Sequence, residues 1–340
     1  MSVSVFIPSH ITGFFSIKND KNPLKKGSCG TGVLIDKGVT TQVKSTNNKN
    51  KKNNESTNNF INIFINGQKD TKNEKITLKT IQIIEKQLKL KIEEGIRIEH
   101  YIDVPIGAGF GTSASCALGT AIGISKYFNL NISKTQMEQI AHLAEISLGS
   151  GLGDILSQTS KGVVIREFPG APGIGKTKEI TKLNSYYKSP NTKENNIEDN
   201  IFEDLRVITK TFGEIDTSSI IQNPKHQSMI NKIGLIMQKK IIDSPTIENF
   251  LDYSYEFAIK TNLMSKQLLN TINDLNNYSI KASMAMLGNT IFAITNKENL
   301  ENIRNIESIE NIKNVENNNT INNFYDFEIY KIHHHGRRIY

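Results

Sequence analysis

The chain has few cysteines, few apolar residues and no long hydrophobic run. Its two cysteines, Cys29 and Cys116, show neither metal-ligand spacing nor a disulfide framework, which predicts a reducing, intracellular compartment. No apolar stretch approaches the length of a membrane span, so no membrane partner is expected. Residues Met1 to Phe6 lack a basic segment followed by an apolar run, so no signal peptide is expected either. Together these absences predict a soluble cytoplasmic protein.

The charge of the chain is basic, but its distribution argues against nucleic acid. Lysine and arginine number 41 and aspartate and glutamate 34, which gives a formal net charge of +7. The lysines lie largely in Asn/Lys-rich stretches and are not interleaved with aromatic residues. This pattern predicts a solvated basic surface that suits anionic substrates, and no nucleic-acid partner is expected.

A chain of 340 residues is long enough for about two domains. Two polar segments cannot pack a core: residues 44–59 are predicted to be a low-complexity insertion, and residues 181–200 a polar linker. These segments account for much of the low hydrophobic content of 37%. The predicted domains are therefore residues 1–180 and residues 201–340.

The spacing of apolar residues predicts a mixture of strands and helices. Strands are expected at residues 3–7, 60–65, 96–104, 163–165 and 204–211, on both sides of Gly288, and at 326–332. Helices are expected at residues 76–91, 116–128, 133–148, 225–241 and 246–273. A hairpin is predicted where two apolar runs flank Asp36-Lys37-Gly38, and Ser133 with Gln136 forms a capping box.

The most informative stretch lies between the predicted strand 96–104 and the predicted helix 116–128. It reads Pro105-Ile106-Gly107-Ala108-Gly109-Phe110-Gly111-Thr112-Ser113-Ala114-Ser115. Glycines let a backbone approach a ligand closely, and the start of a helix offers N–H groups and a partial positive charge. The stretch thus predicts an anion site, most naturally for phosphate, with hydroxyl groups for phosphate or a metal ion. A tight turn that packs the helix on a sheet is the alternative interpretation.

A second acidic and glycine-rich stretch follows the predicted helix 133–148. It reads Gly149-Ser150-Gly151-Leu152-Gly153-Asp154. Asp154 on such a loop could approach a phosphate and act as a general base or hold a hydroxyl group. Glu145, on the preceding helix, could bind Mg²⁺, which prefers oxygen ligands. A helix C-cap followed by a turn aspartate is the alternative.

Three further motifs are weaker. Residues 170–177, Gly170 to Thr177, match the Walker A pattern, but the segment after them is a poor helix and no later strand ends in a suitable aspartate. The small residues of 282–290 predict a backbone packed close to a site, or an ordinary strand, turn and strand. The adjacent His333, His334 and His335 are interpreted as tail composition, since their spacing does not favour metal binding.

Residues 105–115 resemble the ATP-binding signature of the GHMP kinases, P-x-x-x-G-L-G-S-S-A-A, with Phe110 and Thr112 as mild changes. The resemblance implies an α+β fold: an N-terminal half like the second domain of ribosomal protein S5, a C-terminal ferredoxin-like half, and a site in the cleft between them. It implies ATP and Mg²⁺ as cofactors, with the nucleotide on residues 105–115. It also implies Asp154 as the catalytic residue and Ser113 with Glu145 as metal ligands, the hydroxyl ligand being Ser113 or Thr112.

The opening Pro8-Ser9-His10-Ile11-Thr12-Gly13-Phe14-Phe15 is similar to that of archaeal pantoate kinases, a branch of this family. So are residues 149–154, 162–173, 213–219 and 282–290, so the similarity covers nearly the whole chain. The resemblance implies ATP-dependent phosphorylation of (R)-pantoate to 4-phosphopantoate in archaeal coenzyme A biosynthesis. His10 stands where the family has its usual basic residue, and His10 or Arg166 is predicted to hold the substrate carboxylate.

Three alternatives stay open from the sequence. The chain could act on another substrate of the family, such as mevalonate or homoserine. It could be a P-loop NTPase that uses residues 170–177, or a non-catalytic nucleotide-binding module on the same fold. The expected partner is a small molecule, and a homodimer is left open.

Overall fold

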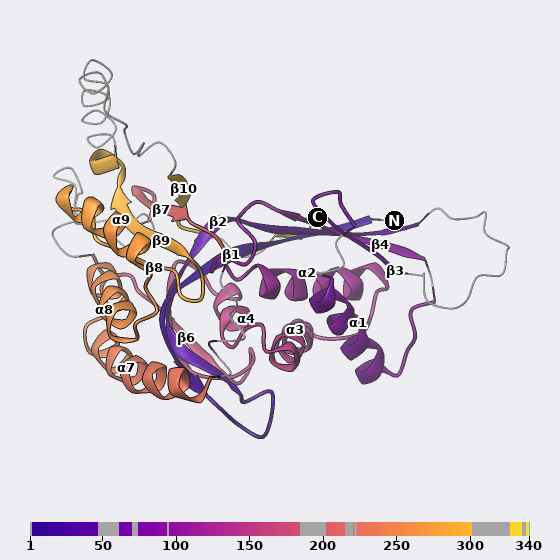
Figure 1. Ribbon diagram of the computed structural model, residues 1–340. Coiled ribbons are helices and arrows are strands. Elements are labelled where there is room, and N and C mark those ends of the chain that lie inside the picture. The colour runs from indigo at the N-terminus through magenta and orange to yellow at the C-terminus, as the bar shows by residue number, and fades with distance from the viewer. Residues whose placement is uncertain are drawn as a thin grey trace, which may run out of the picture.

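The computed structural model describes residues 2–46, 61–69, 74–93, 95–183, 202–214, 220, 223–300, 327–334 and 338–339. Most of the predicted insertion 44–59, most of the predicted linker 181–200 and residues 215–219 lie outside the described residues. The described part forms two sheets with helices packed against them (Figure 1).

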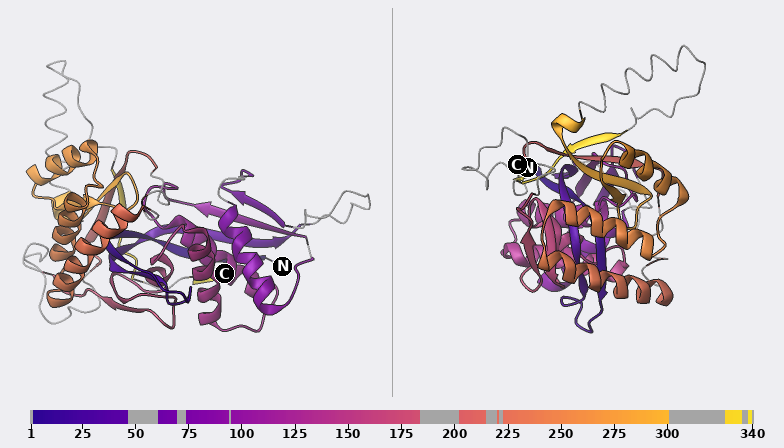
Figure 2. Two further views of the ribbon diagram at one scale, coloured as in Figure 1. Left: turned by 60° about the horizontal axis from the view of Figure 1, so that its bottom comes forward. Right: turned by 90° about the vertical axis from the view of Figure 1, so that its left-hand side faces the viewer.

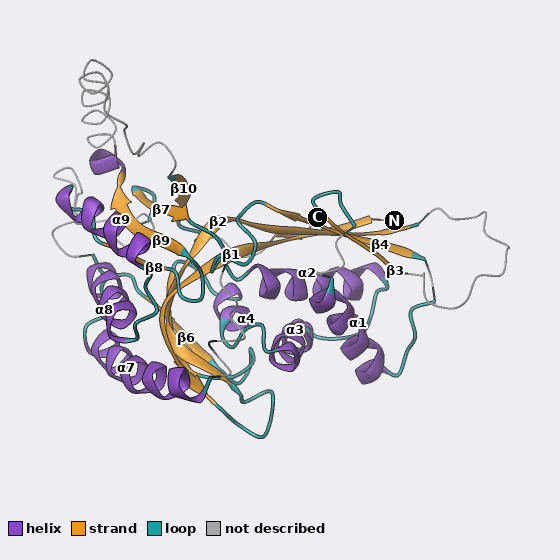
Figure 3. Ribbon diagram, in the orientation of Figure 1, coloured by secondary structure: helices purple, strands orange, loops and turns teal. Residues whose placement is uncertain are grey.

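The first sheet carries the site, and helices α1, α2 and α3 cover one of its faces (Figures 1 and 3). Its strand order is β11-β1-β2-β4-β3, and β5 joins β2 and also pairs with β6. The β3 and β4 strands are parallel and the other pairs are antiparallel. Its strands are β1 (Ser2–Lys18), β2 (Gly27–Ser45), β3 (Ile61–Ile65), β4 (Ile96–Ile102), β5 (Val163–Phe168), β6 (Lys176–Glu179) and β11 (Arg338–Ile339).

The β1 and β2 strands are long and curved, and they connect the two halves of the molecule (Figure 1). Their register shifts twice, between Pro8 and Ser9 and again between Thr12 and Phe14. Such bulges bend a strand. The predicted hairpin at Asp36-Lys37-Gly38 is wrong, because β2 runs through these residues and the first register shift leaves Asp36 and Lys37 exposed and unpaired.

The helices follow the apolar patterns of the sequence with one exception. The capping box of Ser133 and Gln136 is present at the start of α3, but the single helix expected at 246–273 is wrong. Asn262 adopts a left-handed conformation after α8, and Ser265 caps a separate helix, α9. The described helices are α1 (Lys75–Leu88), α2 (Thr112–Tyr127), α3 (Lys134–Leu148), α4 (Asp154–Gln158), α7 (Pro224–Asp243), α8 (Ile247–Lys260) and α9 (Lys266–Asn277).

The second sheet has the ferredoxin-like arrangement that was expected. It consists of β7 (Leu205–Thr211), β8 (Ala282–Met284), β9 (Thr290–Asn296) and β10 (Glu328–Lys331). The spatial order is β10-β7-β9-β8, and every pair is antiparallel. The α+β class and its two-part organisation are thus confirmed.

The two halves are interleaved at their edges. The β11 strand, from the end of the chain, pairs with β1 at the edge of the first sheet, while the end of β1 packs against α7 and α8 of the second half (Figure 2). The domain boundary predicted at residues 181–200 therefore stays a prediction. The final strand, β11, belongs to the first sheet although it follows the second half in the sequence. Among the described residues, no helix has the length and apolar character needed to cross a bilayer.

Candidate functional site

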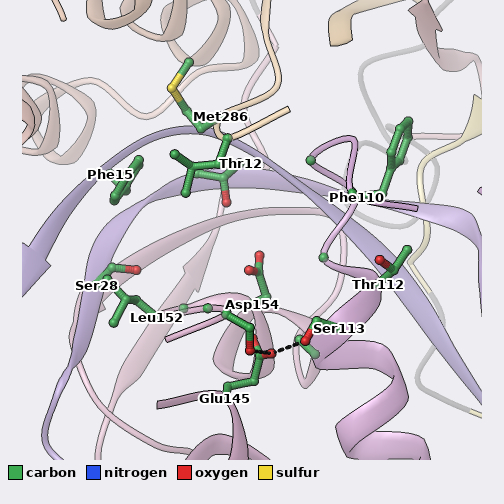
Figure 4. A pocket seen from close by; sticks show the side chains of 18 of the residues that line it. Thr12, Phe15, Ser28, Phe110, Thr112, Ser113, Glu145, Leu152, Asp154 and Met286 are labelled. Atoms are coloured by element: carbon green, nitrogen blue, oxygen red, sulfur yellow. Dashed lines mark hydrogen bonds between the residues drawn. The ribbon is translucent and has the colours of Figure 1, made fainter. Parts of the chain in front are cut away.

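A cleft lies where the glycine-rich loop, α2, α4, β1 and the β8–β9 turn meet. Figure 4 shows Ser113 and Glu145 on the side of α2, Thr12, Phe15 and Met286 across the cleft, and Asp154 between the two groups. The cleft therefore collects residues from both halves of the chain, and a ligand bound there would contact both.

The glycine-rich loop places backbone amides along one wall of the cleft. Gly109 and Gly111 have φ angles of +90° and +64°, values that residues other than glycine rarely adopt. Gly111 is the N-cap of α2, and no side chain caps this helix. Because the first N–H groups of a helix have no partner within it, the amides of the first turn can bind an anion.

The turn between β8 and β9 supports this loop from behind. A Cβ on Gly288 would overlap the carbonyl group of Ala108, so only glycine allows the two backbones to come this close. The amide of Met286 donates to the carbonyl oxygen of Thr12 over 2.8 Å, and the amide of His10 donates to that of Phe110 over 3.1 Å. The small residues of 282–290 thus pack against the loop, as their composition predicts.

Asp154 lies beside the start of α2. Its Cγ is 3.3 Å from the place where a Cβ on Gly111 would stand. At the other end of α4, the Gln158 amide donates to the carbonyl oxygen of Gly111 over 3.0 Å and to Ser115 Oγ over 2.8 Å. These bonds fix α4, and with it Asp154, relative to the glycine-rich loop.

Asp154 is also hydrogen-bonded to a buried histidine, which in turn contacts a buried arginine. Its Oδ1 is 2.7 Å from Nδ1 of His10, and Nε2 of that ring is 3.4 Å from Nη1 of Arg166. Burial lowers the pKa of His10, so the ring is neutral near pH 7, although the contact with Asp154 acts in the opposite direction. For Asp154, burial raises the pKa, but the hydrogen bond with His10 and the charge of Arg166 outweigh it, so the net pKa lies below its usual value.

Glu145 supplies a second carboxylate to the cleft, and it is only 2% exposed. Its Oε1 accepts hydrogen bonds of 2.6 Å from Ser113 and from Ser150. Burial raises the pKa of Glu145 to about 7, although both hydrogen bonds lower it. Gly151 lies so close that a Cβ there would overlap Glu145 Oε2, and the same point is 3.5 Å from Oδ2 of Asp154.

This pair of carboxylates and a hydroxyl group fits a hard cation. Within the described residues there is no group of three or more His, Cys, Asp or Glu that could hold a metal ion alone. Glu145, Asp154 and Ser113 nevertheless offer the oxygen ligands that Mg²⁺ takes when it binds together with substrate phosphates.

The predicted nucleotide-binding residues do not all reach the cleft. Those that line it are Gly107, Gly109, Phe110, Gly111, Thr112, Ser113 and Ala114, whereas Pro105, Ala108 and Ser115 do not. The ring of Phe110 is buried and packs edge-on against Tyr330, with 6.3 Å between ring centroids. The carbonyl oxygen of Phe110 is likewise taken by the amide of His10.

The two predicted carboxylate-binding residues have different positions. Arg166 lines the cleft, although it is only 1% exposed. His10 is fully buried, does not line the cleft, and has both ring nitrogens in contact with Asp154 and Arg166. The prediction that His10 or Arg166 holds the substrate carboxylate stays a prediction, and Arg166 is the one of the two that lines the cleft.

Sequence reasoning missed several residues of the site. Thr12, Ser28 and Met286 line the cleft, and Gln158 connects α4 to the loop. The position of Gln158, one helical turn after Asp154, was a signal that could have been used, because residues i and i+4 share a helix face. Thr12 and Ser28 lie on strands whose bends bring them to the site, and periodicity carries no sign of this.

The Walker-like segment has the wrong structure for a phosphate-binding loop. Lys176 begins the strand β6, whereas the pattern requires a helix at that point. The ammonium group of Lys176 lies 5.3 Å from the centroid of the Phe168 ring, and neither residue lines the cleft. The P-loop alternative is thus excluded by the local fold.

Comparisons with known proteins agree with this geometry. Residues 75–162 match the family model of the GHMP kinases N terminal domain. The chain is 34% identical to the pantoate kinase of Methanocaldococcus jannaschii over 86% of this chain and 93% of that one. It is 30% identical to the pantoate kinase of Thermococcus kodakarensis over 88% of this chain and 89% of that one.

A solved structure described as a phosphotransferase related to the CoA biosynthesis pathway is similar over the whole chain. It has a TM-score of 0.77 and 26% identity, and the alignment covers 100% of this chain and 98% of that one. With these matches, and with the glycine-rich loop and Asp154 on one cleft, the chain belongs to the GHMP kinases, a family of ATP-dependent enzymes.

Proposed function

We propose that this protein transfers the γ-phosphoryl group of ATP to the primary hydroxyl group of (R)-pantoate, giving 4-phosphopantoate for coenzyme A synthesis. The observation that carries the proposal is the position of the Asp154 carboxylate, directly beside the uncapped start of α2. The names of the two archaeal relatives and of the solved phosphotransferase support the choice of substrate.

The nucleotide would bind with its phosphates on the loop from Gly107 to Ala114. The amides of this loop and the partial positive charge of the α2 start favour an anion there. Ser113 and Glu145 would hold Mg²⁺, which neutralises phosphate charge in phosphoryl transfer. The raised pKa of Glu145 supports a cation site, since a buried carboxylate is most easily ionised beside positive charge.

The alcohol substrate would bind at the other end of the cleft, with its carboxylate on Arg166. Among the described residues, no carboxylate lies within ion-pair distance of this guanidinium group, and its buried Nε has no hydrogen-bond partner. A buried charge without a partner is costly, so an anionic ligand there gains from satisfying it. Arginine also matches the planar geometry of a carboxylate.

The same end of the cleft has an apolar wall. Phe15 and Met286 are each 4% exposed and Leu152 is 9% exposed, and all three line the cleft opposite the first turn of α2 (Figure 4). Pantoate carries two methyl groups on the carbon next to its primary alcohol. An apolar wall combined with a buried cation suits a small acid with such a branched, apolar centre.

Phosphoryl transfer from ATP needs alignment and charge neutralisation more than covalent help. The bond between the γ-phosphorus and the bridging oxygen breaks, ADP leaves, and the alcohol oxygen forms the new bond to phosphorus. Asp154 would accept a hydrogen bond from the alcohol and receive its proton. Because the pKa of Asp154 is below its usual value, the carboxylate orients the alcohol early and takes the proton late, once the new bond has made that proton acidic.

The proposal is tested by measuring ADP release by the purified protein with ATP, Mg²⁺ and either pantoate, mevalonate or homoserine, with the phosphorylated product identified by mass spectrometry. We expect turnover with pantoate at least 100-fold above that with the other two alcohols, of the order a polar site achieves. Turnover of mevalonate or homoserine without turnover of pantoate would overturn the substrate assignment. Nucleotide binding without turnover of any alcohol would point to a non-catalytic module.

Two variants give a matched control. Asp154→Asn removes the proposed proton acceptor and is expected to lower kcat by about 100-fold or more. Lys176→Ala changes the Walker-like segment on β6 and is expected to leave kcat unchanged. The reverse result would reject the site proposed here.

A further inference from the structure

His10 is a buried histidine that contacts the central carboxylate of the cleft without reaching the cleft itself. We infer that His10 is a positioning residue for Asp154: a neutral ring, protonated on Nδ1, that is oriented by Arg166 and holds one oxygen of the Asp154 carboxylate. This inference rests on the proposed function for its kinetic consequences. Its structural part, the protonation state of the ring, can be tested without any substrate.

The protonation state follows from the partners of the two ring nitrogens. Arginine has only donors, so the 3.4 Å contact from Arg166 Nη1 requires Nε2 of His10 to accept. The remaining proton of a neutral ring then lies on Nδ1, where it donates to Asp154 Oδ1 over 2.7 Å. Thr12 Oγ1 is 3.4 Å from the same nitrogen and is a weaker contact.

Two further contacts hold the Arg166 and His10 side chains of this hydrogen-bonded series in place. Arg166 Nη1 also donates to Ser157 Oγ over 2.9 Å, which ties the guanidinium group to α4, the helix that carries Asp154. The His10 ring packs against Gly32 of β2 so closely that a Cβ there would overlap Nε2. The ring is thus held between β2 and β5 and cannot turn toward the cleft.

The contact divides the tasks of the two carboxylate oxygens of Asp154. Oδ1 is taken by His10, while Oδ2 faces Gly151 and Glu145, on the side of the proposed cation. With one oxygen anchored, the carboxylate plane cannot rotate freely toward the uncapped start of α2. A displacement of about 1 Å at a reacting group can lower a rate by two orders of magnitude.

Two substitutions separate positioning from simple packing. His10→Asn places an amide donor near the position of Nδ1, whereas His10→Leu fills the volume without a donor. For His10→Leu we expect kcat to fall about 100-fold while the KM for ATP stays within about threefold. For His10→Asn we expect recovery of at least a tenth of the wild-type kcat.

The outcomes keep this inference apart from the proposed function. If the wild-type protein turns over no alcohol, the proposed function fails, and the ring state is still decided by ¹⁵N NMR of histidine-labelled protein, where a proton on Nδ1 is expected. If wild-type protein is active and both variants lose activity equally, His10 is only structural and the inference is rejected. A proton found on Nε2, or a doubly protonated ring at neutral pH, overturns it as well, even if His10→Leu does not fold.

Discussion

Replacing Glu145 by glutamine should stabilise the protein at neutral and basic pH in the absence of divalent cations. Burial raises the pKa of Glu145 from 4.5 to about 7 in the folded state, and the side chain is only 2% exposed. One pKa unit corresponds to 1.36 kcal/mol, so ionised Glu145 costs the folded state about 3 kcal/mol. Glutamine has the same shape and carries no charge, so it removes this cost.

The sign of the pH dependence follows from proton linkage. Between about pH 4.5 and 7 the folded state binds more protons at Glu145 than the unfolded state does, so stability falls as the pH rises. The difference in unfolding free energy between Glu145→Gln and wild type should therefore grow by about 3 kcal/mol across this window and level off above it.

The assay is urea unfolding in EDTA at several pH values between about 5 and 8, for wild type and Glu145→Gln. Ser150→Ala serves as a matched variant, because it keeps the carboxylate and removes one hydrogen bond that lowers its pKa. Its stability should keep falling to a higher pH than that of wild type. Saturating Mg²⁺ should raise the unfolding free energy of wild type, because the cation binds the folded state, but it should not raise that of Glu145→Gln. A difference between wild type and Glu145→Gln that stays constant with pH would refute the reasoning.

Three further predictions concern the supports and walls of the site. Gly288→Ala places a methyl group against the Ala108 carbonyl and should cost about 1–3 kcal/mol of unfolding free energy and raise the KM for ATP, as urea unfolding and steady-state kinetics would show. Burial lowers the pKa of His100 to about 4, so stability should fall by about 3 kcal/mol as the pH drops from 6.5 to 4, a dependence that His100→Gln should abolish in urea titrations. Met286→Ser should lower the preference for pantoate over an analogue without its two methyl groups by about tenfold, measured as a ratio of kcat/KM values.

The sequence predicted the local parts of the site well. The alternation of residues 96–104, the glycine-rich loop and the helix after it correspond to β4, the loop and α2. The capping box at Ser133 fixed the start of α3, and therefore the position of Glu145 on that helix. These features depend on contacts between residues close in the chain, which periodicity and capping describe.

The parts that depended on long-range geometry were harder to predict. The sequence around Asp36-Lys37-Gly38 predicted a hairpin, but a register shift between β1 and β2 lets β2 continue through these residues as one strand. The bend of β1 also brings Thr12 to the cleft. The helix break at Asn262 carried no glycine or proline signal. Periodicity reports which face of an element is buried, but it does not report where two elements cross.

His10 shows what residue type alone does not report. In the sequence, His10 stands where the resembling family has a basic residue, which suggested a positive charge for the substrate carboxylate. In the structure, its complete burial lowers its pKa, so it is neutral, and its two nitrogens are used by Asp154 and Arg166. A neutral, buried ring carries no charge that could attract an anion, but it can hold the Asp154 carboxylate in place. Arg166 brings a positive charge to the cleft, and among the described residues no carboxylate lies within ion-pair distance of its guanidinium group.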